Sequence, residues 1–314
     1  MNRNMVKDAL LGVAIGDAIG VPVEFRTRKA LMQDPVTGMR AYGSHQQPAG
    51  TWSDDSSLTF CLAEMLCERY DLVNLANRFI NWKQNSYWTA HGHVFDMGIA
   101  TSAAIEELAM GIRPVLAGGY HEGSNGNGSL MRILPLLFFI QHKKINERFL
   151  IIKDVSSLTH SHVRSVLSCF IYLEMALQIK KGANCVDAYR KACEIVNAFL
   201  DEGAICTAEE RALFTRILSG TIFTLEEDEI KSSGYVIHTL EASIWCFLNT
   251  ENYKDAILKA VNLGEDTDTT AAVTGGLAGL YYGYESIPAD WLAVLARRQD
   301  IDDLCDRLNN KINF

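Results

Sequence analysis

The sequence predicts an all-α protein. Apolar residues recur at intervals of three and four along most of its 314 residues, as on one face of a helix, and no run alternates as a half-buried strand would. Only six prolines interrupt this pattern, and no stretch rich in Ser, Gly and Pro divides the chain. We therefore expect residues 1–314 to form a single compact helical domain.

The first predicted helix lies near the N-terminus. Gly12, Gly16 and Gly20 recur every four residues and share one face, which favours close packing against another helix over contact with a ligand. The apolar run Ala9–Ile15 in this segment is too short to span a membrane, and no signal-peptide cleavage pattern accompanies it. We therefore expect no membrane segment.

Helical periodicity continues along the rest of the chain. It predicts helices over residues 56–66, 72–80, 166–176 and 237–248, and from Ala271 onwards. The apolar run Leu130–Ile140 predicts another helix, which would begin directly after a loop rich in glycine and asparagine.

Composition narrows the class of protein. A hydrophobic content of 48% is enough for a substantial core. The formal net charge is −9 and no basic stripe is present, so we expect no nucleic-acid partner. The eight cysteines fall mostly within helical patterns and form no Cys-x-x-Cys pair, which predicts a cytoplasmic protein with buried thiols.

Two acidic clusters are the candidate seat of the chemistry, Ser53-Asp54-Asp55 and Asp266-Thr267-Asp268-Thr269. Each precedes a predicted helix, and Ser, Thr and Asp are preferred N-cap residues, so helix capping is one interpretation. A metal site is the other, because four carboxylates brought together repel one another unless water or cations separate them. The donors are all oxygens, which suits Mg²⁺, Mn²⁺ or Ca²⁺ and argues against zinc or copper.

A third candidate is the loop Gly123–Ser129, which contains three glycines and two asparagines. Backbone N–H groups at a helix N-terminus bind anions readily, so the loop is a candidate phosphate cradle. It matches neither a Walker loop nor a dinucleotide fingerprint, and a flexible loop is the alternative.

Taken together, four segments resemble the ADP-ribosylglycohydrolase family, which includes the dinitrogenase reductase-activating glycohydrolases and the ADP-ribosylarginine and ADP-ribosylserine hydrolases. They are GVAIGDAIGVPVEF at 12–25, TWSDDS at 51–56, GNGSLMR at 126–132 and GEDTDTTAA at 264–272. The resemblance covers roughly residues 7–283. One departure is Glu265, which stands where many relatives have a second glycine before the aspartate.

The resemblance implies an all-α orthogonal bundle with a two-metal centre, usually Mg²⁺ or Mn²⁺, at the base of an ADP-ribose cleft. Its implied ligands come from the two acidic clusters: Ser53, Asp54 and Asp55 for one ion, Asp266 and Thr269 for the other, and Asp268 for both. Glu24 would be a further ligand or a gate.

The spacing of the second cluster agrees with that division. Asp266 and Asp268 would point about 200° apart on a regular helix, so they must sit at a turn that leads into the helix. From there Asp266 and Thr269 can face one ion while Asp268 reaches across. Small residues follow and would let the helix pack closely behind the metals, namely Ala271, Ala272, Gly275 and Gly276.

The resemblance also implies the substrate contacts. Gly126, Asn127, Gly128 and Ser129 would wrap the diphosphate and ribose, beside the positive end of the following helix. Asp96 would approach the ribose or its leaving group, with an N-cap role as the alternative.

Two further residues are implied near the cleft. His160 would contact the substrate or a metal ligand, and Tyr235 would line the adenosine or ribose pocket. For both, a structural role is the alternative. His91 and His93 lack a third ligand for zinc, so we expect them in a solvated loop.

The function implied is hydrolysis of the C1″ bond of an ADP-ribose conjugate, with an arginine of a modified protein as the acceptor. The metals would orient the ribose hydroxyls and lower the pKa of a water. Candidate catalytic residues are Glu24, Asp55 and Asp96, with Asp55 or Asp96 as the proton carrier. The alternatives are a serine-linked conjugate, O-acetyl-ADP-ribose, a modified nucleic-acid end, a non-catalytic ADP-ribose-binding or toxin-immunity protein, and a two-metal phosphohydrolase.

Overall fold

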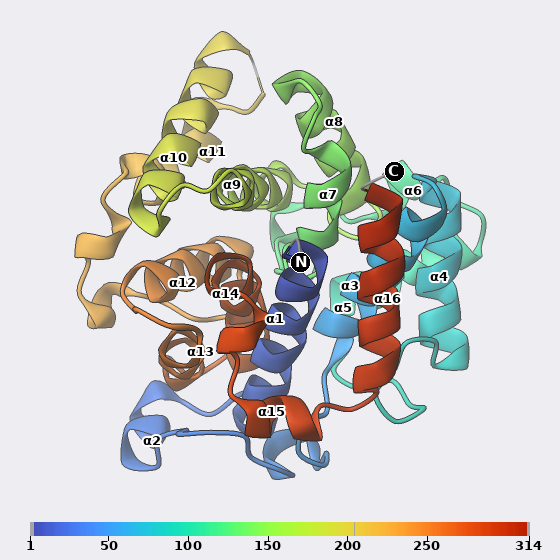
Figure 1. Cartoon of the computed structure of the whole chain (residues 1–314). Coiled ribbons are helices and arrows are strands. Elements are labelled where there is room, and N and C mark those ends of the chain that lie inside the picture. The colour runs from blue at the N-terminus through green and yellow to red at the C-terminus, as the bar shows by residue number, and fades with distance from the viewer. Residues whose placement is uncertain (1–2, 204, 313–314) are drawn as a thin grey trace.

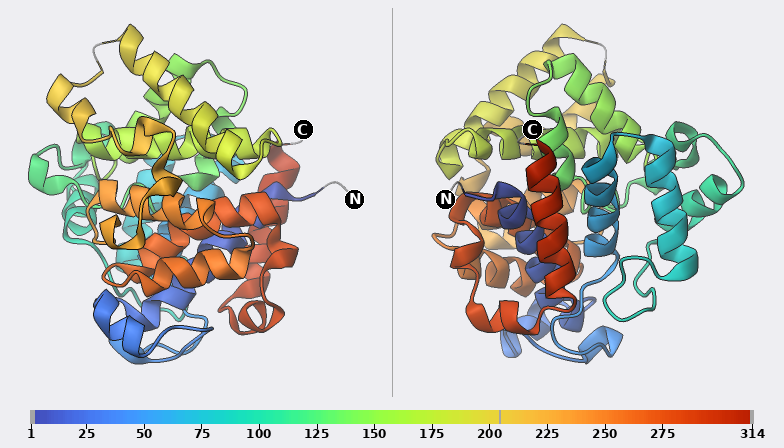
Figure 2. Two further views of the ribbon diagram at one scale, coloured as in Figure 1. Left: turned by 90° about the vertical axis from the view of Figure 1, so that its left-hand side faces the viewer. Right: turned by 45° about the vertical axis from the view of Figure 1, so that its right-hand side comes forward.

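The computed structural model describes residues 3–203 and 205–312. Within these ranges the protein consists of helices joined by loops, and its β-type pairing is limited to three isolated bridges. Figure 1 shows α9 along its axis and α16 from the side, and the views in Figure 2 agree that these helices cross steeply. The all-α prediction is confirmed.

Two buried helices form the centre of the molecule, α1 (Met5–Gly20) and α14 (Thr267–Tyr282). They touch backbone to backbone. A Cβ added to Gly12 would lie 2.2 Å from the carbonyl oxygen of Gly275, and one added to Gly16 would lie 2.1 Å from that of Ala271. The glycine face of α1 therefore serves helix packing, as its four-residue spacing predicts.

The remaining helices surround this pair (Figure 1). α16 and α3 pack on one side of α1, α12 and α13 pack against α14, and α9 joins α14 to α10 and α8. Their bounds are α2 Arg28–Gln33, α3 Asp54–Glu68, α4 Leu72–Asn85, α5 Ile99–Ala109, α6 Pro114–Ala117, α7 Leu137–Ile140, α8 Ile145–Ser156, α9 Val163–Lys180, α10 Cys185–Glu202, α11 Ala208–Ala212, α12 Val236–Leu248, α13 Tyr253–Asn262, α15 Ala289–Val294 and α16 Arg298–Ile312.

One predicted helix is wrong. Residues 130–132 form turns, Leu134–Leu136 is a short 3₁₀ helix (η4), and only Leu137–Ile140 is α-helical. Pro135 explains the difference, because proline lacks an N–H donor and disfavours the α conformation in the residue before it. No long helix therefore begins directly after the glycine-rich loop. The helix dipole that was expected to favour anion binding there is absent.

The structure also shows the state of the cysteines and the character of the apolar helices. All eight cysteines are free thiols, and five of them are buried: Cys61, Cys169, Cys193, Cys246 and Cys305. Among the described residues no helix is both long enough and apolar enough to cross a membrane.

Candidate metal centre and substrate cleft

The first turns of α3 and α14 bring the two acidic clusters together. The Thr269 hydroxyl donates to Oδ2 of Asp55 at 3.3 Å, and the Ser53 hydroxyl donates to the same oxygen at 3.0 Å. Each cluster begins where its helix begins, since Ser53 is the N-cap of α3 and Asp266 is the N-cap of α14. The predicted turn before the second helix is therefore present.

Asp268 lies at the meeting point of the acidic groups. Asp268 belongs to two groups of acidic residues: it has a carboxylate oxygen within 4.8 Å of oxygens of Asp17 and Asp55, and one within 4.8 Å of oxygens of Glu24 and Asp266. It is fully buried, and its Oδ1 accepts the backbone N–H of Thr269 at 2.8 Å. This position allows Asp268 to serve both halves of the site.

Capping accounts for only part of the arrangement. The Ser53 side chain accepts the N–H of Asp55 at 3.3 Å, as an N-cap residue does. Asp266 occupies the cap position of α14 without a capping bond, and its Oδ2 accepts from the Asn127 amide at 2.8 Å instead. Helix capping likewise gives no reason for the buried carboxylates of Asp55 and Asp268.

Three carboxylate oxygens provide the test of a metal site. Oδ1 of Asp55, Oδ1 of Asp266 and Oδ2 of Asp268 are buried and have no hydrogen-bond partner. Burial raises the pKa of all three carboxyls, because an ionised carboxylate loses its hydration there. Unpaired buried oxygens are costly unless a ligand satisfies them. The acidic clusters are therefore able to hold hard divalent cations.

Asp54 faces the open side of the same centre. It lines the cleft together with Asp266 and Thr269. Burial, followed by the neighbouring charges of Asp96 and Asp17, raises the pKa of Asp54 well above its usual value. The crowding of carboxylates expected from the sequence is thus present.

Asp17 is a member of the cluster that sequence reasoning did not assign a role. Its carboxylate accepts the backbone N–H groups of Ser53 (2.9 Å) and Ser56 (3.0 Å) and the Ser56 hydroxyl (2.5 Å). Burial raises the pKa of Asp17 to about 6 despite these bonds. Its oxygens are occupied, so it positions the first turn of α3. A lone aspartate within the apolar helix α1 was the available signal.

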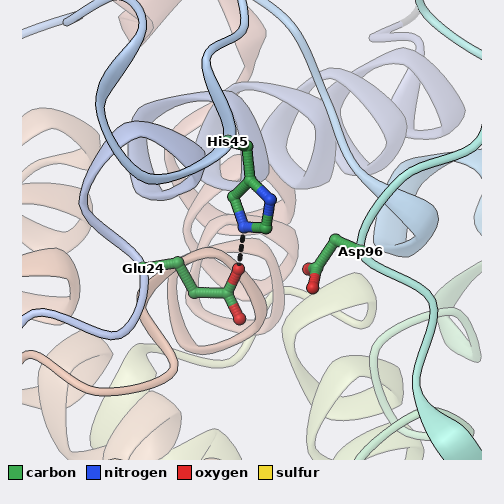
Figure 3. A group of neighbouring side chains, drawn as sticks. All are labelled: Glu24, His45 and Asp96. Carbon is green, nitrogen blue, oxygen red and sulfur yellow. Dashed lines mark hydrogen bonds and ion pairs between the residues drawn. The ribbon is translucent and has the colours of Figure 1, made fainter.

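Glu24 and Asp96 reach towards each other from separate loops beneath the ring of His45 (Figure 3). Nε2 of His45 makes a hydrogen bond with Oε2 of Glu24, and donor atoms of all three residues lie within 4.8 Å of one another. Burial, Asp96 and Asp266 raise the pKa of Glu24 to about 10. His45 was missed in the sequence because nothing near it in the chain indicates its partner.

Asp96 lines the cleft beside Glu24. Its φ is +50°, a left-handed conformation that aspartate tolerates better than most residues. The N-cap of α5 is Gly98, so the alternative interpretation of Asp96 as a helix cap is wrong.

The glycine-rich loop forms another wall. Its Gly126, Asn127 and Gly128 line the cleft, whereas Ser129 is fully buried and its hydroxyl accepts from Cys169 at 3.5 Å. The Asn127 amide joins the loop to the acidic centre by donating to Asp266. The structure therefore brings three of the four predicted loop residues to the cleft.

Arg132 supports this loop from behind, a role that the sequence did not reveal. It is fully buried, donates to the carbonyl oxygens of Gly128 and Val155, and lies over the Phe79 ring at 5.0 Å. Burial lowers the pKa of Arg132 to about 10, so it stays a cation at neutral pH.

His160 lies between the loop and the protein interior. It lines the cleft, and its Nδ1 makes a 2.8 Å hydrogen bond with the Thr159 hydroxyl. A Cβ on Gly128 would lie 2.8 Å from its Cε1 atom, so this ring requires glycine above it. Burial, with Arg132 nearby, lowers the pKa of His160 to about 3 and keeps it neutral.

Four other residues considered in the sequence lie off the cleft lining: Tyr235, His91, His93 and Glu265. The Tyr235 ring packs edge-on against His238 at 5.0 Å, and its backbone pairs with Gly126. His91 and His93 are exposed, as expected of a solvated loop. Glu265 is also exposed, so its side chain points away from the acidic centre.

The cleft has a volume of about 500 Å³ and is lined at its base by Asp54, Asp266 and Thr269. A hollow of about 580 Å³ lies elsewhere, between α8, α9 and α10, and is lined mainly by apolar side chains. It contains none of the predicted site residues. We place the candidate active site in the acidic cleft because only there do cation ligands, a glycine-rich loop and space for a ligand coincide within the described ranges.

An all-α bundle with paired acidic helix ends is the architecture expected of an ADP-ribosylglycohydrolase. The family model for ADP-ribosylglycohydrolase matches residues 2–313, and the chain belongs to this family of hydrolytic enzymes. It is 34% identical to the ADP-ribosylarginine hydrolase Tri1 of Pseudomonas putida (strain GB-1), over 96% of this chain and 77% of the relative.

Two further comparisons agree. The ADP-ribosyl-[dinitrogen reductase] glycohydrolase of Rhodospirillum rubrum is 27% identical over 91% of this chain and 88% of its own. A solved structure described as an ADP-ribosylglycohydrolase-related protein complex superposes with a TM-score of 0.79 and 27% identity, covering 99% of this chain and 100% of that one. The resemblance drawn from the four sequence motifs is confirmed.

Proposed function

We propose that the protein removes ADP-ribose from an arginine side chain of a modified protein, in a reaction that depends on two divalent cations, Mg²⁺ or Mn²⁺. The observation that carries the proposal is the set of partnerless buried oxygens of Asp55, Asp266 and Asp268. They belong to the two acidic clusters, which also supply Asp54, Asp266 and Thr269 to the lining of a cleft large enough for a ligand. The relatives named as ADP-ribosylarginine hydrolases support arginine as the acceptor.

The implied ligands for the cations are Ser53, Asp54 and Asp55 on α3 and Asp266, Asp268 and Thr269 on α14. Bound there, the cations would orient the ribose hydroxyls and make a water molecule more acidic near neutral pH. All six residues lie at helix N-termini held by rigid packing, which keeps their geometry fixed before a ligand arrives.

The diphosphate would lie along Gly126, Asn127 and Gly128. Glycines there let the backbone approach a ligand closely, and the bond from Arg132 occupies the Gly128 carbonyl oxygen. Asn127 would set the distance between loop and cations through its bond to Asp266. His160, neutral and buried, would support the loop from below.

In the reaction, the water oxygen bonds to C1″, the C1″–N bond breaks, and a water proton ends on the departing guanidino nitrogen. We assign the proton transfer to Asp96. It lines the cleft, whereas Oδ2 of Asp55 is occupied by Ser53 and Thr269. Glu24 lies between Asp96 and the cation ligands and would control access to them.

The substrate partner is thus an ADP-ribosylated protein and the product is free ADP-ribose. Eight free thiols suit a reducing compartment, so we place the reaction in the cytoplasm.

The test is release of ADP-ribose from peptides modified on arginine or on serine, with Mg²⁺ or Mn²⁺ and with EDTA. We expect release from the arginine peptide, loss of release with EDTA, and loss in Asp55→Ala and Asp268→Ala. Asp255→Ala is the matched control, because Asp255 also lies in the first turn of a helix but is exposed. Release from neither peptide, with ADP-ribose still bound, would overturn the proposal, and AMP as product would indicate a phosphohydrolase.

A further inference from the structure

A row of aromatic rings borders one side of the acidic centre. The Phe25 ring lies 5.8 Å from the His45 ring, the His45 ring lies 5.2 Å from Phe95, and Phe95 lies 6.1 Å from His93, all centroid to centroid. The His45 ring is also the one that contacts Glu24, above the gap between Glu24 and Asp96 (Figure 3). The carboxylates of Glu24 and Asp96 therefore lie next to the His45 ring in the middle of this row.

The row and the glycine-rich loop contact different members of the acidic centre. Asn127 of the loop bonds Asp266, and oxygens of Asp266 and Glu24 lie within 4.8 Å. Glu24 in turn contacts His45, whose ring neighbours Phe25. If the diphosphate lies on the loop and the ribose on the cations, the group attached to C1″ projects towards the aromatic row.

Burial does not explain the position of the Phe25 side chain. Its side chain is 70% exposed, so the ring gains little from burial. Its φ is +65°, which costs free energy in a residue other than glycine. The backbone is held there because the Phe25 N–H donates to the Glu265 carbonyl at 2.7 Å. A strained and exposed aromatic residue that also lines the cleft indicates a contact with a ligand.

We propose that Phe25, His45 and Phe95, together with the carboxylates of Glu24 and Asp96, form the subsite that recognises the guanidinium group of the arginine acceptor. This inference rests on the proposed function and adds the residues that select the acceptor. A guanidinium is planar and weakly hydrated, stacks on aromatic faces and donates its N–H groups to carboxylates in its own plane. Phe25, Glu24 and Asp96 all line the cleft, and the His45 ring, which neighbours Phe25 and Phe95, contacts Glu24 from behind that lining.

A serine acceptor would gain little here. Its linkage carries no cation and no planar group, so ring faces and paired carboxylates offer it no specific attraction. The adenine ring is planar too, but it is neutral and does not call for two carboxylates. Stacking of adenine on Phe25 is therefore the competing result that the experiment has to separate.

The experiment measures kcat/KM on an ADP-ribosylarginine peptide and the Kd of free ADP-ribose, in the cation-loaded full-length protein. Phe25→Leu keeps an apolar side chain but removes the ring face, and Phe25→Trp restores a stronger one. We expect Phe25→Leu to lower kcat/KM about three- to fivefold, the size of an exposed cation–π contact. Phe25→Trp should equal or exceed the wild type, and the Kd of ADP-ribose should be the same in all three.

Tyr42→Leu is the matched control. Tyr42 is aromatic, 61% exposed and also has a φ of +65°, but it is not part of the cleft lining. Equal effects of Phe25→Leu and Tyr42→Leu would overturn the inference, as would a weaker Kd for ADP-ribose in Phe25→Leu. Absence of release from the arginine peptide by the wild type would instead show that the proposed function had failed.

Discussion

The packed contact between α1 and α14 differs in one respect from the acidic start of α14, which is how fully each region is satisfied by the protein itself. Along the contact, Gly12, Gly16 and Gly275 let the backbones touch, and no space is left for a side chain. At the end, where α14 begins, Asp266 and Asp268 each carry a buried oxygen without a partner. The tight helix packing therefore holds in place carboxylates whose oxygens have no hydrogen-bond partner in the protein. Such a site is organised in advance for a ligand.

The largest effect is expected from disrupting the packed part. In Gly16→Leu the new Cβ would lie 2.1 Å from the Ala271 carbonyl oxygen, a backbone atom that cannot move aside alone. We expect a loss of at least about 3 kcal/mol in the free energy of unfolding, or no folded protein. Urea unfolding followed by circular dichroism measures this.

Gly123→Leu provides the control for that substitution. A Cβ at Gly123 would meet no atom within 4 Å, and its backbone is not left-handed. Its free energy of unfolding should change by less than about 1 kcal/mol. Similar losses in the two variants would contradict the importance of the α1–α14 contact.

The second largest effect is expected on Mg²⁺ affinity, from a substitution in the first turn of α14. Asp268→Asn keeps the side-chain shape but removes the charge shared by both halves of the site. We expect at least about a 100-fold loss of Mg²⁺ affinity, measured by calorimetry. In EDTA the variant should be as stable as the wild type or more so, because a buried unpaired carboxyl has been removed. Lower stability in EDTA would show that Asp268 is structural, and Asp255→Asn, on the exposed start of α13, should change neither quantity.

The third effect is the pH dependence of the cation-free protein. The pKa of Glu24 is raised to about 10 from 4.5 in the unfolded chain, mainly by burial. A raised carboxyl pKa stabilises the folded state below the unfolded pKa, and this contribution is lost as pH rises towards the folded value. Between about pH 6.5 and 8.5 the melting temperature in EDTA should therefore fall. Excess Mg²⁺ should reduce the fall, because cations bind the ionised carboxylates.

His160 sets the lower limit of that pH window. Its pKa is lowered to about 3 from 6.5, so the stability it provides is complete above pH 6.5 and declines as pH falls. Measurements above about pH 6.5 avoid this opposite trend. A melting temperature in EDTA that rises over the window would contradict the raised pKa of the acidic centre.

The smallest effect is expected at Glu265, just before the cluster. Its φ is +63°, and both its N–H and its carbonyl make 2.7 Å backbone hydrogen bonds, to Arg26 and Phe25. Glu265→Gly should relieve the strain and raise the free energy of unfolding by about 0.5 kcal/mol. Glu265→Ala removes the same charge but keeps the strain, so an equal gain in both variants would assign the effect to charge.

Local sequence patterns were sufficient for much of the fold. The helical period located α3, α4, α9 and α12, and the spacing of Gly12, Gly16 and Gly20 indicated a packing face. These features depend on residues close together in the chain. The helix predicted from Leu130 was wrong because Pro135 outweighed the apolar pattern.

The sequence by itself determined the helical class, the glycine face and the all-oxygen donor chemistry of the two acidic clusters. Only the tertiary structure decided which oxygens meet and which remain unpartnered. The bond between Thr269 and Asp55, the bond from the Ser53 N–H to Asp17 and the contact of His45 with Glu24 all join different segments of the chain. Whether a buried carboxylate is satisfied depends on such distant neighbours, and local periodicity contains no information about them.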